Sequence, residues 1–402
     1  MTRISLPAFA FVTLGFCASA SAQDFGSAWI DRVTHELIEE GGQLSAHPVE
    51  YKASAGVLFS WDNNIFLTHT NRTASGVIIP FASASLEYAQ PNFDAAADLS
   101  VNYNWYTKDS DFNADEERFF GRVRYSGTRI TLQLAQVFRH ESSPTDAVVV
   151  TRVPRTLSNT TPLVVWHVTP VFAVEVQSDL QFVNFHRQLF DPGDNFNTRT
   201  LLTLAYTTGW NNMEIVVQGG YLTIDYHDPL SPPDSTGFVA RGGIRGELST
   251  NLHVIALFGF TRADSDDFPG TSTDLTTSTG DIEIHLAYNP NENVTLYADY
   301  SRRIGFSAEG APFQIVNTSA LVGQFAVRDD LKLRARAQYD RITVPGGFRR
   351  AYYSIGAGAE YKVHPNIVLD GGITYRWGVV PGVGGVGNFG DAIFTIGAAV
   401  VF

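Results

Sequence analysis

The feature that most constrains the fold is an alternation of apolar and polar residues that recurs from Tyr51 to the C-terminus. In the stretch Leu331–Tyr339, apolar side chains occupy every odd position, while Lys332, Arg334 and Arg336 occupy even ones. Successive side chains of a β-strand point to opposite faces, so this pattern predicts a strand with one apolar and one charged face. We count about eighteen such stretches and predict an all-β fold.

The connections between these stretches alternate in length. Short ones such as Ser126–Thr128 and His364–Asn366 are followed by long ones such as Glu141–Arg155 and Gly378–Asp391. Outer-membrane barrels have short turns in the periplasm and longer loops outside the cell. A soluble sandwich or propeller gives no reason for so regular an alternation. The sequence therefore predicts a transmembrane antiparallel β-barrel of about eighteen strands.

The C-terminal stretch Ala392–Phe402 places Phe394, Ile396, Ala398 and Val400 on one face and ends in an aromatic residue. A closed barrel would provide a partner for both edges of such a strand. A strand that ends in phenylalanine resembles the closing strand of bacterial outer-membrane barrels. This resemblance implies that Phe402 is the insertion signal and that the barrel assembly machinery is a partner.

The N-terminus has the features of a secretory signal peptide. Arg3 precedes the apolar run Leu6–Phe16, and Ala20-Ser21-Ala22 is a small-residue cleavage site, so we assign residues 1–22 to the signal peptide. Residues 23–48 would form a periplasmic leader, and residues 49–402 the barrel. The only cysteine, Cys17, lies inside the predicted signal peptide.

Composition supports a membrane location and excludes some partners. Charged residues make up 17% of the chain, below the ~25% usual for soluble domains. The net charge of −13 argues against nucleic acid as a partner. We therefore expect the chain to lie in the outer membrane of a Gram-negative bacterium, with membrane lipid around it.

We find no sequence pattern that indicates catalysis. The histidines are scattered without metal-ligand spacing, and neither a GxSxG motif nor a phosphate-binding glycine loop occurs. We therefore predict no catalytic residue, no metal site and no cofactor, and expect that the protein is not an enzyme.

The interior of the barrel gives more information about function than the search for catalytic motifs does. A barrel of about eighteen strands encloses a wide aqueous channel, so the polar face of each strand would line a lumen. Basic residues gather on some strands and acidic residues on others, which predicts a field across the lumen that orients polar solutes. The alternative is that opposite charges pair along the wall. The candidate lumen-facing residues are Arg122, Arg124, Glu175, Gln177, Arg241, Arg245, Glu283, Lys332, Arg334, Arg336 and Asp340.

Two further stretches carry a family resemblance. Trp61–Thr68, with the sequence WDNNIFLT, follows the first expected strand, and Asn102–Tyr106 forms an aromatic strand end. Both resemble segments of a family of β-barrel porins that are commonly encoded with exopolysaccharide biosynthesis and export genes. The resemblance implies a conduit for polysaccharide export, with periplasmic export components as partners. A passive diffusion porin for small polar solutes and a structural or adhesive surface barrel are the alternatives.

Overall fold

The structure, a computed structural model, describes residues 49–65, 72–108, 110–142, 154–186, 193–211, 213–227, 232–266, 275–305, 311–345, 347, 349–379 and 388–402. The predicted signal peptide and the predicted periplasmic leader lie outside these residues. No helix in the described ranges is long and apolar enough to cross a membrane.

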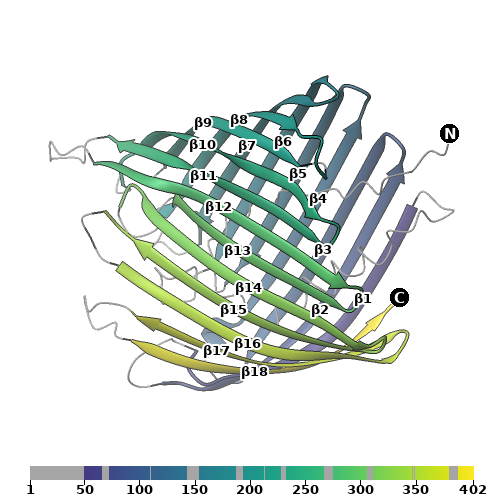
Figure 1. Cartoon of the computed structure of the whole chain (residues 1–402). Coiled ribbons are helices and arrows are strands. Elements are labelled where there is room, and N and C mark those ends of the chain that lie inside the picture. The colour runs from purple at the N-terminus through teal and green to yellow at the C-terminus, as the bar shows by residue number, and fades with distance from the viewer. Residues whose placement is uncertain are drawn as a thin grey trace, which may run out of the picture.

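The described residues form one sheet of 18 strands, in which each strand pairs in antiparallel fashion with the next along the chain. β1 also pairs with β18, so the sheet closes into a barrel and the predicted fold is confirmed (Figure 1). The strands are β1 (Val49–Asp62), β2 (Ser75–Gln90), β3 (Phe93–Tyr106), β4 (Ala114–Ser126), β5 (Ile130–Glu141), β6 (Arg155–Thr169), β7 (Phe172–Phe185), β8 (Asn195–Thr207), β9 (Glu214–Tyr226), β10 (Ser235–Ser249), β11 (Leu252–Ser265), β12 (Thr276–Asn291), β13 (Val294–Gly305), β14 (Gln314–Arg328), β15 (Leu331–Thr343), β16 (Arg349–His364), β17 (Ile367–Val379) and β18 (Phe389–Val401).

Burial alternates along the strands, as the sequence pattern requires. On β3, Leu99, Val101 and Tyr103 are exposed, whereas Ser100 and Asn102 between them are buried. The exposed apolar side chains therefore form the outer surface of the barrel, and the polar ones point inward. An apolar outer belt of this kind is suited to contact with lipid hydrocarbon.

The closing strand completes the ladder. Ser54 to Asp62 of β1 pair with Val401 to Ile393 of β18, and the backbone N–H of Phe402 donates to Ala53 O at 2.8 Å. Phe394 and Ile396 face outward, and Phe402 is exposed at the end of the chain. The role of Phe402 as an insertion signal remains a prediction.

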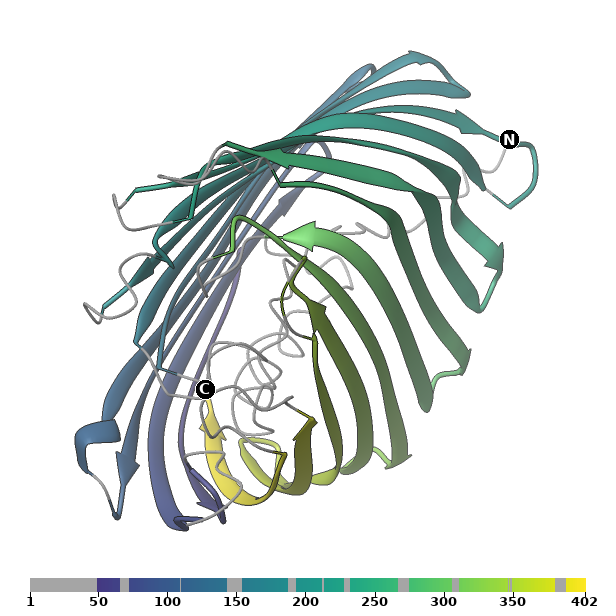
Figure 2. The same ribbon diagram turned by 90° about the vertical axis from the view of Figure 1, so that its left-hand side faces the viewer.

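The two rims of the barrel differ. At one rim the connections are short, and several ladders shift register beside them, as between Glu247 and Ser249 and between Lys362 and His364. Such bulges are common at the rims of barrels. The opposite rim carries the long connections and the short 3-10 helix η1 (Ser110–Phe112). Figure 2, in which the rim of long connections faces the viewer, shows the strands as a continuous wall around the interior.

Candidate functional site: the inner wall of the barrel

The eleven candidate residues lie on the inward-facing side of five strands. They occupy the positions that alternate with exposed apolar residues on β4, β7, β10, β12 and β15. Their contacts divide them into three groups around the wall.

The first group is centred on Arg241 of β10, whose side chain is nearly enclosed. Its Nη1 donates to Asp281 Oδ1 at 3.1 Å and to Glu283 Oε2 at 2.6 Å, both on β12. Its Nε donates to Gln218 Oε1 at 2.6 Å. Arg241 thus joins strands on both sides of its own, because an extended guanidinium presents several donors in a fixed fork.

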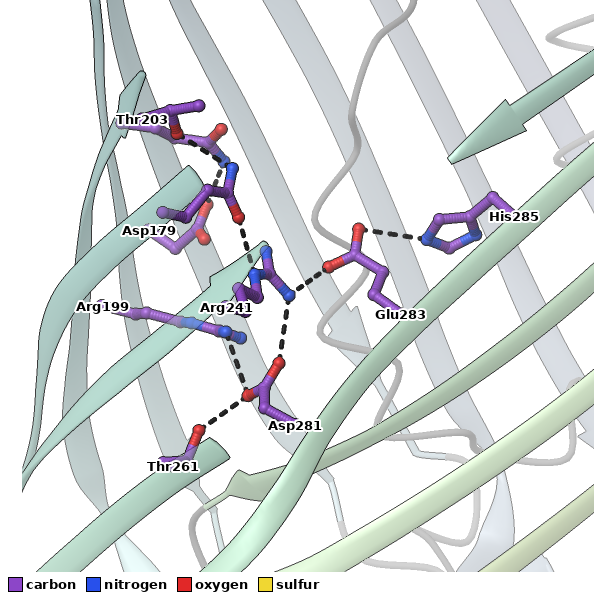
Figure 3. Close-up of polar contacts among 10 residues, drawn as sticks. Asp179, Arg199, Thr203, Arg241, Thr261, Asp281, Glu283 and His285 are labelled. Carbon is purple, nitrogen blue, oxygen red and sulfur yellow. Dashed lines mark hydrogen bonds and ion pairs between the residues drawn. The ribbon is translucent and has the colours of Figure 1, made fainter. Parts of the chain in front are cut away.

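Asp281 is the most buried carboxylate of this group. It also accepts hydrogen bonds from Arg199 Nη2 at 3.3 Å and from Thr261 Oγ1 at 2.7 Å. Figure 3 shows that these side chains converge on Asp281 from separate strands. Three donors, one each from Arg241, Arg199 and Thr261, therefore hold one carboxylate, which fits the rule that buried charges are paired and hydrogen-bonded.

Glu283 extends the group toward less buried positions. Its Oε1 lies 3.2 Å from His285 Nε2, and His285 Nδ1 lies 2.6 Å from Asp299 Oδ1 on β13. The side chains of His285 and Asp299 are 40% and 42% exposed. The chain of polar contacts therefore runs from an enclosed arginine to groups that remain open to the interior.

Arg245 of β10 forms a second branch nearer the rim of short turns. It pairs with Glu175 of β7 and, at 2.5 Å, with Glu214 of β9. Gln177, another candidate on β7, donates to Asp179 Oδ1 at 3.2 Å. We call these polar residues of β7 to β13 the first charge network: Glu175, Gln177, Asp179, Arg199, Glu214, Gln218, Arg241, Arg245, Thr261, Asp281, Glu283, His285 and Asp299.

A glycine on the neighbouring strand leaves space for the side chain of Arg241. Gly259 of β11 lies directly opposite Arg241 in the ladder. A Cβ at this glycine would lie 2.4 Å from the Cβ of Arg241 and 2.0 Å from Ala240 O. Any larger residue would displace the strand or the arginine, so the position of Arg241 depends on a residue with no side chain.

The second group lies on β15 to β18 and β1. Arg334 Nη2 donates to Asp370 Oδ1 at 2.6 Å, and both side chains are almost completely buried. Arg336 donates to Gln338, whose Nε2 donates to Asp340 Oδ2 at 2.7 Å. Lys332 is half-buried and lies opposite Glu360 of β16 in the ladder.

The same group closes the barrel. Arg376 of β17 donates from Nε to Asp391 Oδ2 of β18 at 2.8 Å, and its Nη2 lies 3.5 Å from Asp62 Oδ2 of β1. These three strands meet where the first and last strands pair. The ion pair therefore ties together the two ends of the barrel sequence.

The third group lies on β3 to β6. Arg122 Nη2 pairs with Asp94 Oδ2 at 3.0 Å, and Arg124 lies opposite Asp94 in the ladder. At the rim of long connections, Arg155 Nη2 pairs with Glu141 Oε1 at 2.7 Å, and neither side chain is appreciably exposed. Arg124 is placed beside Asp94 by the register of β3 and β4.

At least six of the eleven candidates have an oppositely charged partner on another strand: Arg122, Glu175, Arg241, Arg245, Glu283 and Arg334. Pairing along the wall, the alternative considered from the sequence, therefore describes these residues better than separate basic and acidic walls do. The field across the lumen is correspondingly weakened, because each of these charges has an opposite charge within a few ångströms.

Several partners are absent from the sequence-based candidates. They include Asp281, Arg199, Glu214, Asp94 and Asp391. Each one occupies an inward position of its strand, so the alternation carries the signal that could have found them. The alternation does not give the register between strands, which decides which charged side chains pair.

The described residues contain no group of three or more side chains suited to hold a metal ion. The closed antiparallel wall, its exposed apolar belt and its polar inner face define the class of this protein. It is a β-barrel of the outer-membrane type, and it lies in the outer membrane as a multi-pass barrel.

Comparison with known proteins gives the following likenesses. No protein-family model matches the chain, and no curated protein matches it. Among solved structures, the outer membrane protein OpdK from Pseudomonas aeruginosa covers 88% of this chain and 99% of its own, with a TM-score of 0.45 and 10% identity. OccAB4 from Acinetobacter baumannii covers 88% and 98%, with a TM-score of 0.43 and 11% identity.

The FrpB iron transporter from Neisseria meningitidis covers 89% of this chain and 82% of its own, with a TM-score of 0.42 and 8% identity. These are likenesses of barrel architecture alone. None of the comparisons links the chain to the family associated with exopolysaccharide genes, so that resemblance stays a prediction.

Proposed function

We propose that this protein is an outer-membrane conduit for polar, hydroxyl-rich solutes, and that the solute is a secreted polysaccharide. The observation that carries the proposal is the first charge network. It places carboxylates, guanidinium groups, carboxamides and hydroxyls side by side across β7 to β13. Several of these groups, including His285 and Asp299, keep part of their surface exposed.

Such a wall suits sugar hydroxyls for a chemical reason. A hydroxyl both donates and accepts hydrogen bonds, so it can exchange partners with carboxylates on one side and with guanidinium groups on the other. Because the charges of the wall are paired, a neutral chain can pass without displacing a tightly held counterion. The resemblance to porins encoded with exopolysaccharide genes supports polysaccharide as the cargo.

Passive diffusion of small polar solutes is the second candidate. Barrels of 16 to 18 strands are wide enough to leave an aqueous channel, and the 18 strands of this wall fall in that range. The same paired charges would admit small solutes without strong selection by sign. The two candidate functions differ in the solute that passes through the barrel and not in the structure of its inner wall.

The test is extracellular polysaccharide in a deletion strain, compared with the same strain complemented with the natural chain. We expect polymer to be lost outside the cell and retained inside. Complementation with Arg245→Gln, which changes a partly exposed arginine of the inner wall, should restore less polymer than complementation with Arg262→Gln, an exposed arginine on the next strand. Heat-modifiable mobility would verify that both variants form the barrel.

Conductance in planar lipid bilayers tests whether the barrel is a channel, independently of which solute it transports. Conductance with unchanged polymer in the deletion strain would contradict polysaccharide export and favour the diffusion porin. A folded barrel without conductance and without an effect on polymer would contradict both, and would favour the structural or adhesive barrel.

A further inference from the structure

A group of polar side chains lies on the outer wall of the barrel, where lipid hydrocarbon is expected. Gln136 of β5, Ser158 and Thr160 of β6, Ser178 of β7 and Thr200 of β8 occupy outward positions on four adjacent strands. We call these five residues the outer polar seam. Leu134, Val164, Val176 and Leu202, which share this parity on the same four strands, are exposed and apolar.

Gln136 and Ser178 of the seam lie within the apolar belt and not at its edge. Gln136 is bracketed on its own strand by the outward residues Leu134 and Phe138. Ser178 is bracketed in the same way by Val176 and Leu180. Polar residues at a barrel rim would have apolar neighbours on one side only, so these positions belong to the membrane interior.

The seam residues are hydrogen-bonded to one another across the strands. Gln136 Nε2 donates to Ser158 Oγ at 2.9 Å, and Thr160 Oγ1 donates to Gln136 Oε1. The hydroxyls of Ser178 and Thr200 lie 2.9 Å apart. Gln136 Nε2 also donates to Val137 O at 3.2 Å, so the carboxamide uses both of its donors. The hydroxyls use only part of their capacity in these contacts, because a hydroxyl has one donor and two acceptor sites.

The backbone beside the seam is also interrupted. The β6–β7 ladder passes from the pair Thr160 and Leu180 to the pair Leu163 and Gln177. Pro162, which lies between them on β6, has no N–H to donate. Proline is normally confined to edge strands and bulges, so its place in a central strand leaves a ladder hydrogen bond unmade next to Ser178.

Hydrocarbon offers these groups nothing to bind. Unsatisfied polar groups cost free energy in the membrane interior, and polar side chains on transmembrane surfaces often hydrogen-bond to another protein segment. The seam contains donors and acceptors together, so a second identical seam can satisfy it. A patch that complements itself forms a two-fold contact, in which both subunits use the same surface.

We infer that the outer polar seam is the contact surface between two copies of this chain in the membrane, which form a two-fold dimer through β5 to β8. The strands themselves remain paired within each barrel, and the side chains of the seam meet across the interface. This inference rests on the outer surface and not on the proposed function of the interior.

Cysteine crosslinking in native outer membranes tests the dimer. Leu202→Cys places a thiol beside the seam without altering it, and Ile355→Cys on β16 is the matched control. The side chains of Leu202 and Ile355 are 49% and 51% exposed. Both variants carry Cys17→Ser, so each chain contains a single thiol. Mild oxidation before extraction avoids dissociation in detergent.

We expect Leu202→Cys to give a disulfide-linked species of twice the chain mass, at a yield at least tenfold above that of Ile355→Cys. Equal yields from the two variants would overturn the inference. So would a crosslink from Leu202→Cys to a different protein, identified by mass spectrometry.

A second set of variants tests the hydrogen bonds themselves. Gln136→Leu, Thr160→Val and Thr200→Val, combined in the Leu202→Cys chain, make the seam apolar and should leave the barrel folded, because these side chains face lipid. We expect the crosslinked fraction to fall at least tenfold while heat-modifiable mobility is retained. An unchanged crosslinked fraction in the folded variant would show that the polar groups do not hold the contact.

Discussion

On β17 and β18 the side chains of Arg376 and Asp391 are 3% and 0% exposed, whereas Arg245 and Glu214 on β10 and β9 are 29% and 25% exposed. Both are arginine–carboxylate pairs on the inner wall, joined by short contacts between strands. The first is enclosed where the barrel closes, and the second faces the interior. The difference indicates that one pair maintains the structure and that the other is available to a solute.

The physical basis of this difference is solvation. Removal of one partner from an enclosed pair leaves a charge that neither water nor protein compensates. A pair that retains contact with water loses much less, because solvent takes over the missing interaction. The same substitution should therefore have different effects at the two sites.

The largest effect is expected for Arg376→Met. This change leaves Asp391 and Asp62 close together and enclosed, and it should reduce the free energy of unfolding by about 3–5 kcal/mol. Urea unfolding of the barrel in lipid vesicles, followed by tryptophan fluorescence, measures the loss. Arg245→Met is the matched control and should cost less than Arg376→Met, because Arg245 and Glu214 keep part of their surface in contact with water. Equal losses at the two sites would remove the distinction between them.

A second substitution compares the two faces of one strand. Leu333 of β15 is exposed on the outer wall, beside the enclosed Arg334 of the inner wall. Leu333→Arg should destabilise the barrel by about 1 kcal/mol, because it places a cation on the lipid-facing wall near the start of β15, where the cost is smaller than at the middle of the membrane. The yield of heat-modifiable barrel in the outer membrane measures this effect, with Leu333→Phe as the control. A normal yield for the arginine variant would contradict the assignment of this face to lipid.

The smallest effect on stability, but a visible one on transport, is expected for Arg245→Gln. The change removes one cation from the interior and leaves Glu175 and Glu214 in place. We expect a shift of reversal potential toward cations that corresponds to about 1 kcal/mol, or roughly fivefold in the permeability ratio. Arg245→Lys should leave the ratio nearly unchanged. If Gln and Lys give the same ratio, Arg245 does not face the path of the ions.

The sequence by itself determined the architecture of the barrel. Alternation with period 2 assigns each residue to one face, and this assignment holds for residues as different as Phe394, Leu333 and Arg334. The alternation of short and long connections gave the antiparallel order of neighbouring strands. Both signals are local, because they depend only on the direction of side chains along one strand.

Only the tertiary structure decided which polar residues meet. Arg245 contacts Glu175 from a strand three places away, and Arg376 contacts Asp62 across the closure of the barrel. These contacts depend on the register between strands and on the reach of long side chains along the wall, which no single stretch encodes. The outer polar seam is a similar case, because Gln136, Ser178 and Thr200 are ordinary polar residues until pairing brings them to one sector of a surface that faces lipid.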